Sequence, residues 1–301
     1  MLNIFGKSKP GAEGPDLSGI LAGFSIEIMP RTAAKVENFR TLLPADTRVY
    51  IAHIEGTPIE DMVATAKRLR EDGFPVMPHF PARIIASKAV LEDWIKRYTD
   101  VGVDQALLLA GGVAQPHGDF HSSMQLLETG LFDANGFKRL HVGGHPEGNK
   151  DIDPDGSTKE VDKAVLWKQA FSERTDAKMA IATQFAFEAK GVTEWAERLQ
   201  KMGVTIPIHV GIAGPTKLQT LIKFAIACGV GPSLKVLQKR ALDLTKLMVP
   251  FEPTEILADL AEYKKANPNS LIEQIHFFPL GGIVANGEWA REHGGGAPVE
   301  A

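Results

Sequence analysis

The sequence of 301 residues lacks several features that would place it in a special class. It contains a single cysteine, Cys228, so no internal disulfide can form, and we expect this thiol to be a small buried side chain on a helix. No apolar run approaches the roughly 20 residues of a membrane-spanning helix. The first residues do not have the layout of a secretory signal. These absences predict a cytoplasmic protein with no membrane association.

An excess of positive charge is also absent. The net charge is −4, from 33 Lys and Arg against 37 Asp and Glu, and the basic residues are scattered along the chain. This distribution argues against a nucleic-acid interface and against a polybasic membrane patch. A composition that is 44% hydrophobic and 23% charged is that of an ordinary globular protein. We therefore expect small-molecule partners, and a homo-oligomer is possible.

Eight short β-rich runs recur along the chain, and helical patterns fill most of the gaps between them. Several runs are almost continuously apolar, as parallel strands covered on both faces are. The runs are 24–29, 48–54, 74–80, 105–110, 139–144, 177–185, 205–211 and 271–279. This alternation predicts an α/β fold, a (β/α)8 TIM barrel, with a doubly wound open sheet as the alternative.

The helical patterns carry start and stop signals. In 57–73 we expect Thr57 to cap a helix, Pro58 to take its first position and Glu60 to complete a capping box. Ser87 is expected to cap the next helix in the same way.

The organisation predicted for the chain is a single barrel domain over residues 1–301. Its ordered core is expected to span about residues 20–285, with flexible tails at 1–16 and 290–301, because these ends are polar or glycine-rich. The long gap before the eighth run holds two further helical patterns, 231–248 and 254–266. We interpret them as extra helices in the last repeat.

Glu27 is a carboxylate within the first run. Strand alternation places Phe24, Ile26 and Ile28 on one face and Ser25 and Glu27 on the other. The bulky face should meet the helices, so Glu27 is expected to point into the barrel near its mouth, where active sites of such barrels lie. Burial there would raise its pKa towards the range of a general acid. The alternative is a salt bridge to a lysine inside the barrel.

Other polar residues stand at the ends of the later runs. Gln184, at the end of the sixth, suits a bidentate hydrogen bond with an amide-like heterocycle, or else simply closes the strand end. His141 and His145 have the spacing of a metal pair, but four residues of extended strand separate them by roughly 13 Å. No metal site is therefore expected.

Two glycine pairs follow strands, Gly111–Gly112 after the fourth run and Gly281–Gly282 after the eighth. Each would let the backbone approach a phosphate, although such pairs are frequently only tight turns. Neither matches a Walker or dinucleotide-binding fingerprint.

Taken in order, these strand ends resemble the methylenetetrahydrofolate reductase family, whose members are FAD-dependent (β/α)8 barrels. The similar segments are F-S-I-E-I-M-P-R-T at 24–32, P-H-F at 78–80, G-G-H-P-E-G at 143–148, T-Q-F-A-F at 183–187, G-I-A-G-P-T-K-L-Q-T-L-I-K-F-A at 211–225 and I-H-F-F-P-L at 275–280. T-Q-F-A-F resembles the family's most recognisable motif. The match runs from about residue 22 to residue 282.

The resemblance implies an oxidoreductase of one-carbon metabolism that interconverts 5,10-methylenetetrahydrofolate and 5-methyltetrahydrofolate, with hydride passing through N5 of FAD. It implies that Glu27 is the general acid and that Gln184 binds the pterin of the folate substrate. Leu218 stands where the family usually has a phenylalanine that stacks on nicotinamide or folate. The positions that it implies for FAD contacts are His79, Ala110, Gly111, Gly112, Ser123, His145, Asn149 and Lys168.

The chain departs from the family pattern at several of these positions. Ala110 and Gly112 replace an arginine and an aspartate, Asn149 replaces a histidine, and Gly282 takes the place of a substrate-binding arginine. With Leu218, these changes lead us to expect weakened use of NADH or NADPH, another electron partner, or operation in the oxidative direction.

Two other functions stay open: another barrel enzyme such as a phosphate-handling lyase or isomerase, and a non-catalytic relative that binds folate or flavin. Thr183 and Gln184 stand where an aldolase would carry its Schiff-base lysine on the sixth strand, which counts against the aldolase version. A retained Glu27 counts against a pure binding protein.

Overall fold

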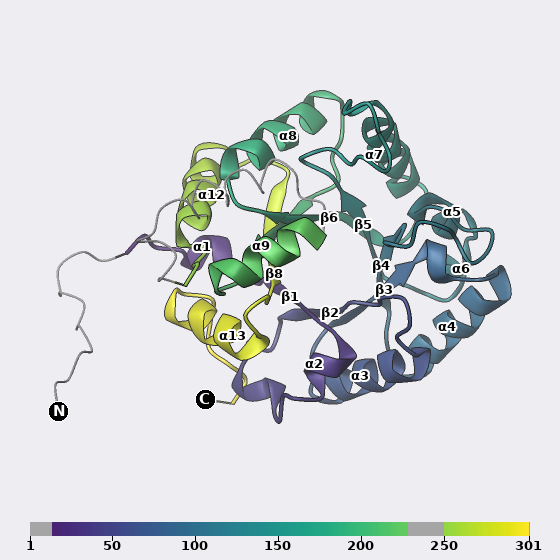
Figure 1. Ribbon diagram of the computed structural model, residues 1–301, viewed down its shortest axis with the longest axis horizontal. Helices are drawn as coiled ribbons and strands as arrows, with labels where there is room; N and C mark the ends of the chain where they lie inside the picture. The colour runs from purple at the N-terminus through teal and green to yellow at the C-terminus, as the bar shows by residue number, and fades with distance from the viewer. Residues whose placement is uncertain (1–13, 228–249, 301) are drawn as a thin grey trace.

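A computed structural model describes residues 14–227 and 250–300 (Figure 1). Its eight parallel strands close into one barrel in the order of the sequence. They are β1 Ser25–Ile28, β2 Arg48–Ile51, β3 Val76–Pro81, β4 Gln105–Leu109, β5 Arg139–Gly144, β6 Lys178–Ala186, β7 Ile208–Ala213 and β8 Ile272–Phe278. Each strand overlaps one predicted run. The prediction of a TIM barrel is confirmed, and the open-sheet alternative is wrong.

Helices surround the barrel (Figure 1). They are α1 Ser18–Leu21, α2 Pro30–Ala33, α3 Ile59–Glu71, α4 Lys88–Asp100, α5 Ser123–Glu128, α6 Leu131–Ala134, α7 Lys159–Ser172, α8 Ala189–Lys201, α9 Leu218–Ala227, α12 Thr254–Ala266 and α13 Ile283–Glu292. Because α9 and α12 both lie between β7 and β8, the last repeat does carry extra helix. Cys228 and the predicted helix over 231–248 lie outside the described residues.

The main core lies between the strands and the helices. Apolar side chains on the outward faces of the strands, such as Ile26 and Ile28, pack with the buried faces of the helices, such as Met62 and Leu69 of α3. Full burial of one such side chain contributes roughly 1.5–3 kcal/mol. This outward burial leaves the alternate strand residues, Glu27 among them, to fill the barrel interior.

The helix starts follow the predictions only in part. Ser87 caps α4, since its hydroxyl accepts a hydrogen bond from the backbone N–H of Val90 at 3.3 Å. The prediction that Thr57 caps α3 is wrong, because the helix begins at Ile59 and Pro58 takes the N-cap position. The backbone at Pro58 is extended, with φ −60° and ψ 140°, so Thr57 stands one residue too early to reach the free N–H groups.

Helix α13 ends at Glu292, inside the segment 290–301 that we expected to be a flexible tail. Trp289 of α13 is 5% exposed and its ring lies edge-on to Phe277 at 6.2 Å. Beyond the helix, the backbone N–H of Val299 donates to Leu43, and Glu300 forms an ion pair with Arg40 at 2.6 Å. Residues 299 and 300 therefore contact the barrel, while the flexibility of the segment stays a prediction.

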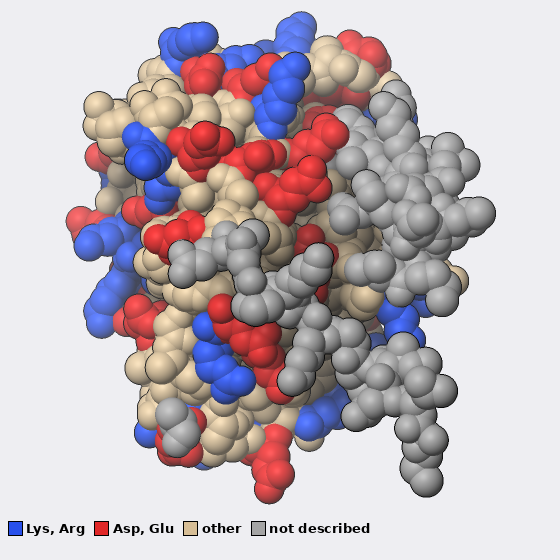
Figure 2. Space-filling view, turned by 90° about the vertical axis from the view of Figure 1, so that its left-hand side faces the viewer, with Lys and Arg blue, Asp and Glu red and all other residues tan. Residues whose placement is uncertain are grey.

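The surface gives little sign of a charged interface. On the face seen in Figure 2, acidic and basic side chains are both present, and the described part of that face shows no continuous basic surface. Among residues 14–227 and 250–300, no helix is long and apolar enough to cross a membrane.

Candidate active site

Glu27 points into the barrel from β1, as strand alternation predicts. Its Oε2 atom lies 3.3 Å from Nε2 of His79 on β3 and 3.9 Å from Nε2 of His276 on β8. The side chain of Glu27 keeps 20% of its surface exposed, whereas the two imidazoles are almost fully buried. The partners of the carboxylate are therefore two histidines and not the lysine of the alternative interpretation.

The pKa of Glu27 shifts in the direction opposite to our prediction. Burial raises this pKa, but contacts with His276 and His79 lower it by more than burial raises it. The pKa therefore falls to about 2. Ser25 lies 3.0 Å from Nδ1 of His276, so the Ser25 hydroxyl can donate there and leave Nε2–H facing Glu27. At neutral pH Glu27 is ionised, and it can accept a proton without first losing one.

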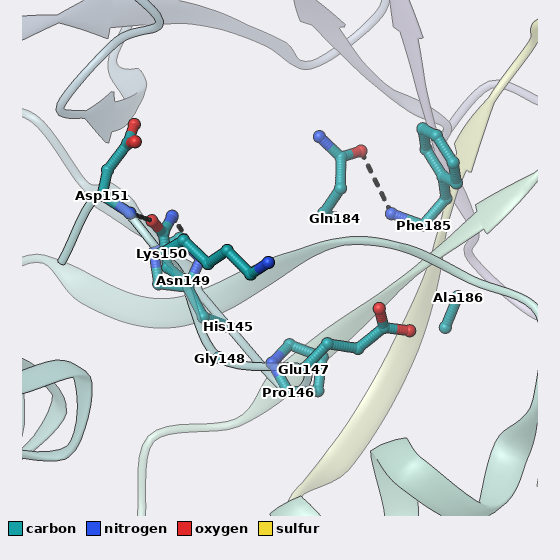
Figure 3. Close-up of a pocket in the computed structure, with 10 residues that line it drawn as sticks. All are labelled: His145, Pro146, Glu147, Gly148, Asn149, Lys150, Asp151, Gln184, Phe185 and Ala186. Atoms are coloured by element: carbon teal, nitrogen blue, oxygen red, sulfur yellow. Dashed lines mark hydrogen bonds between the residues drawn. The ribbon is translucent and has the colours of Figure 1, made fainter. Parts of the chain in front are cut away.

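A groove follows the loops after β4 and β5. One cavity of about 280 Å³ is lined by seven positions that the resemblance assigns to FAD: Ala110, Gly111, Gly112, Ser123, His145, Asn149 and Lys168. A second cavity of about 210 Å³ shares three lining residues with the first and reaches Gln184 (Figure 3). Residues spread over more than fifty positions are thus gathered along one groove.

Lys168 is the buried cation of this groove. It comes from α7, is 5% exposed, and donates from Nζ to the carbonyl oxygen of Gly143 at 2.8 Å. Burial lowers its pKa to about 8, and burial together with the charge of Lys168 lowers the pKa of His145 to about 4. No carboxylate of the described ranges forms an ion pair with Lys168. An ammonium group with only a carbonyl partner suits an anionic ligand such as a phosphate.

Strand β6 is irregular at the position of Gln184. Its register with β7 shifts between Ala182 and Phe185, and the glycine at 211 permits this close approach, because a Cβ there would lie 2.5 Å from the carbonyl oxygen of Thr183. Bulges commonly redirect a side chain next to an active site. Gln184 lines the groove, and its Oε1 atom accepts a hydrogen bond from the backbone N–H of Phe185 at 3.1 Å (Figure 3). The Oε1 atom of Gln184 is therefore already hydrogen-bonded, and the amide N–H groups remain to donate to a ligand.

Glycine is required for different reasons at Gly112 and at Gly281. A Cβ built at Gly112 would meet no atom within 4 Å, and this residue lines the groove. A Cβ at Gly281 would lie 2.1 Å from the carbonyl oxygen of Pro215. Gly281 thus permits close packing against the loop after β7, whereas Gly112 borders open space.

Leu218 is not brought to the groove. It is 3% exposed and packs at the start of α9 in an apolar cluster with Phe185, Phe187 and Phe251. It lines neither of the two cavities of the groove. Its place as a substrate-binding residue stays a prediction, without a contact that supports it.

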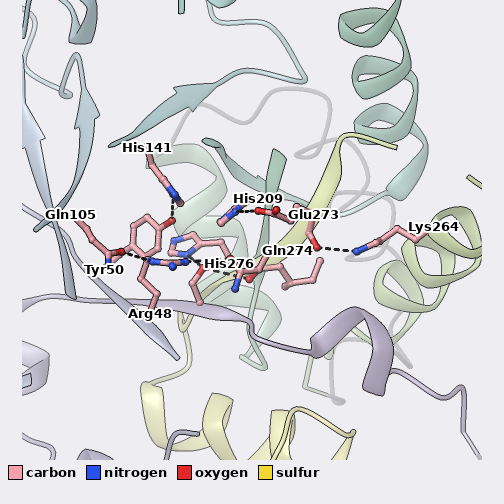
Figure 4. Close-up of polar contacts among 11 residues, drawn as sticks. Arg48, Tyr50, Gln105, His141, His209, Lys264, Glu273, Gln274 and His276 are labelled. Carbon is pink, nitrogen blue, oxygen red and sulfur yellow. Dashed lines mark hydrogen bonds and ion pairs between the residues drawn. The ribbon is translucent and has the colours of Figure 1, made fainter. Parts of the chain in front are cut away.

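From the sequence we did not predict that histidines gather inside the barrel, although we considered His141 as a metal ligand. His141, His209 and His276 are each at most 1% exposed, and Tyr50 lies among them (Figure 4). Alternation along 139–144, 208–213 and 272–278 carried the signal, since each histidine stands at an inward position on its strand. Within the described ranges, no group of three or more His, Cys, Asp or Glu is arranged to hold a metal ion.

Comparison with known proteins adds little about function. No protein-family model matches the chain. A solved structure that it resembles is the 4-hydroxy-tetrahydrodipicolinate synthase of the thermoacidophilic methanotroph Methylacidiphilum fumariolicum SolV, at 14% sequence identity and a TM-score of 0.37. The match covers 62% of this chain and 61% of that one, less than two thirds of its length. A likeness this weak carries no argument about substrate or activity.

Proposed function

We propose that this barrel is an FAD-dependent oxidoreductase that interconverts 5-methyltetrahydrofolate and 5,10-methylenetetrahydrofolate. The observation that carries the proposal is the groove: seven positions chosen for FAD from motif resemblance line one cavity, and Gln184 lines the cavity that adjoins it.

The groove residues fit that cofactor chemically. Lys168 is a buried cation with a carbonyl as its hydrogen-bond partner, and its charge would suit a diphosphate. The space beside Gly112 allows a planar ring system to approach the backbone. When bound, FAD would supply the hydride chemistry, which no side chain of the chain provides. The protein's part is to bind, to orient and to move a proton.

Gln184 would orient the folate. Because its Oε1 atom accepts from the backbone of Phe185, its N–H groups are the free side of the amide. They suit the acceptor atoms of a pterin ring. Glu27 then faces the proton that is gained or lost at the folate nitrogen as the five-membered ring opens or closes.

Glu27 would move the proton of the folate nitrogen. Contacts with His276 and His79 keep its pKa low, so it is a carboxylate at neutral pH. In the oxidative direction it would accept the proton that leaves the nitrogen when methylenetetrahydrofolate forms, and in the reductive direction it would return that proton. We propose the oxidative direction because it starts from the ionised state of Glu27.

A Glu27→Gln substitution tests this assignment. Gln is close to isosteric and keeps hydrogen bonding, so FAD binding should be unchanged while oxidation of 5-methyltetrahydrofolate falls about 10²–10⁴-fold. Glu92→Gln on the exposed face of α4 is the matched control. The absorbance of bound flavin during anaerobic single turnover measures both FAD binding and the oxidation of 5-methyltetrahydrofolate. NADH and NADPH are then compared as redox partners of the flavin. Full activity of Glu27→Gln, or wild-type protein that takes up no FAD, would contradict the proposal.

A second candidate function rests on Lys168. A buried amine with a pKa near 8 is unusually nucleophilic at neutral pH, as in Schiff-base enzymes. Two observations weigh against this function. Nζ of Lys168 already donates a hydrogen bond to the carbonyl oxygen of Gly143, and Lys168 lies on helix α7 and not at a strand end. Borohydride trapping of a carbonyl substrate on Lys168, absent in Lys168→Met, would favour it over the flavin enzyme.

A further inference from the structure

Arg83 is a second cation in the wall of the groove. It belongs to the short 3-10 helix η2 Ala82–Ile84, which follows β3, and it lines the same cavity of about 280 Å³ as Lys168. Its side chain is half-buried. Arg83 is not among the positions that the resemblance assigns to FAD, so its place in this wall comes from the structure alone.

The backbone of Arg83 is fixed from two sides. Its N–H donates to the carbonyl oxygen of Ala110 at 2.9 Å, and its carbonyl oxygen accepts from the N–H of His117 at 2.8 Å. The loop after β4 comes this close because position 118 is a glycine: a Cβ at Gly118 would lie 2.0 Å from the carbonyl oxygen of Ala86. The side chain of Arg83 therefore starts from a well-defined position.

The same loop orients the guanidinium group of Arg83. Its Nε–H donates to the carbonyl oxygen of His121 at 3.3 Å, and Nη1 donates to the carbonyl oxygen of Val113 at 3.2 Å. These are its side-chain hydrogen bonds within the described residues. Because a guanidinium carries five N–H groups, three remain for another acceptor, both of those on Nη2 among them. Donors that are already oriented lose less conformational entropy when a ligand binds.

No carboxylate neutralises Arg83 within the described part of the chain. The arginines that form ion pairs there are Arg40, Arg97 and Arg198. Asp151 supplies a carboxylate to the wall of the same cavity, but it is exposed and forms an ion pair with neither Arg83 nor Lys168. His145 has a pKa of about 4 and is neutral at neutral pH. Two cations against one carboxylate leave the cavity wall with a net positive charge.

The two cations stand on opposite sides of the end of β4. Arg83 follows β3, Lys168 donates to Gly143 of β5, and β4 lies between these two strands in the barrel. β3 and β5 are two strand spacings apart, about 10 Å. The residues that follow β4, Ala110 to Gly112, carry no charged side chain. An anionic ligand that lies across them would meet a cation on each side.

We propose that Arg83 is a binding residue of the groove and that, with Lys168, it holds the phosphate groups of the ligand across the end of β4. The proposal rests on the proposed function, in which that ligand is FAD and the phosphates are its diphosphate. Guanidinium and ammonium groups both form charge-assisted hydrogen bonds to phosphate oxygens, and the planar guanidinium can donate two at once. Arg83 would thus recognise the phosphates, whereas Gln184 and Glu27 act on the folate.

Flavins with and without phosphate separate this role from a structural one. Riboflavin carries the ring of FAD but no phosphate. Arg83→Met should weaken FAD binding about 10–100-fold, which is the contribution of one charge-assisted hydrogen bond, and should leave riboflavin binding within about twofold. Arg291→Met, at an exposed position of α13, is the matched control and should change neither affinity. Titrations of flavin fluorescence measure both affinities without turnover.

Salt gives the second readout. FAD binding to the wild type should weaken more steeply with ionic strength than binding to Arg83→Met, because the variant has lost one of the two cations that salt screens. Three results would overturn the proposal: unchanged FAD affinity in Arg83→Met, equal salt dependence in the two proteins, or an equal loss of affinity for FAD and riboflavin. The last result would show that Arg83 only holds the loop after β4.

ADP distinguishes failure of this site from failure of the proposed function, since it carries a diphosphate but no flavin. If the wild type takes up no FAD but binds ADP, and Arg83→Met weakens ADP binding about tenfold or more, the proposed function fails and the phosphate site stands. ADP binding that is equal in the two proteins would overturn the role of Arg83. A wild type that binds neither FAD nor ADP would overturn both.

Discussion

Glycine has a different role on each of the two sides of the barrel mouth. After β4 and β5, Gly112 borders an open groove whose buried cation is Lys168. After β7 and β8, Gly281 lets one loop press against Pro215 of the other, and Leu218 is sealed in an apolar cluster nearby. A glycine pair at a strand end therefore says nothing about a ligand until the space around its Cβ position is known.

The comparison also bears on the electron partner. Leu218 and Gly282 stand where the resemblance would place groups that face nicotinamide or the folate tail, and both lie on the closed side. The open side holds seven of the positions that the resemblance assigns to FAD. This division agrees with a flavin enzyme whose second redox partner differs from that of the family.

The closed side should respond to Leu218→Ala with the largest loss of stability. Removing a side chain that is 3% exposed should lower the free energy of unfolding by about 2–5 kcal/mol. FAD affinity should not change, because Leu218 does not line the groove. Urea unfolding and a flavin titration measure the two quantities. A variant that keeps its stability but binds folate or nicotinamide poorly would place Leu218 in the site after all.

On the open side, Lys168→Met should change how stability and FAD affinity depend on pH. The folded pKa of about 8 lies below the ordinary 10.5, so the unfolded chain binds more protons between these values, and wild-type stability rises with pH across that window. The gain relative to Lys168→Met should reach about 3 kcal/mol. In wild type, FAD affinity should fall above about pH 8 as Lys168 loses its charge, and in the variant this dependence should vanish. Parallel pH curves for both proteins would show that Lys168 is not buried as a cation.

Alanine at the two glycines sharpens the contrast with the smallest effects. Gly281→Ala forces a methyl group onto the Pro215 carbonyl and should lower stability by about 1–3 kcal/mol, with FAD affinity kept. Gly112→Ala should leave stability within about 0.5 kcal/mol but weaken FAD binding, because its methyl group enters the groove. Equal behaviour of the two variants would remove the distinction between the sides.

Much of this architecture follows from local pattern. All eight strands were predictable from β-rich runs, and alternation alone sent Glu27 inward. The bulge at Gln184 was not predictable, because it arises from the register between β6 and β7 and from the close approach that Gly211 of β7 permits.

The pKa of Glu27 was predicted in the wrong direction for a similar reason. His276 meets Glu27 only because β8 closes the barrel beside β1, 249 positions later in the chain, as residue numbers 276 and 27 show. Burial is visible in a hydrophobic pattern, but the two imidazoles that outweigh it come from strands that only the closed barrel brings together.

Titration of the Glu27 carboxyl tests the central claim most directly. Carbon-13 NMR of labelled protein, with Glu27→Gln to assign the signal, follows its ionisation from about pH 8 to about pH 4. Because contacts with His79 and His276 outweigh burial, the carboxylate should stay ionised across this range. A midpoint above about pH 5 would contradict the account, since burial would then outweigh the contacts of Glu27 with the two imidazoles.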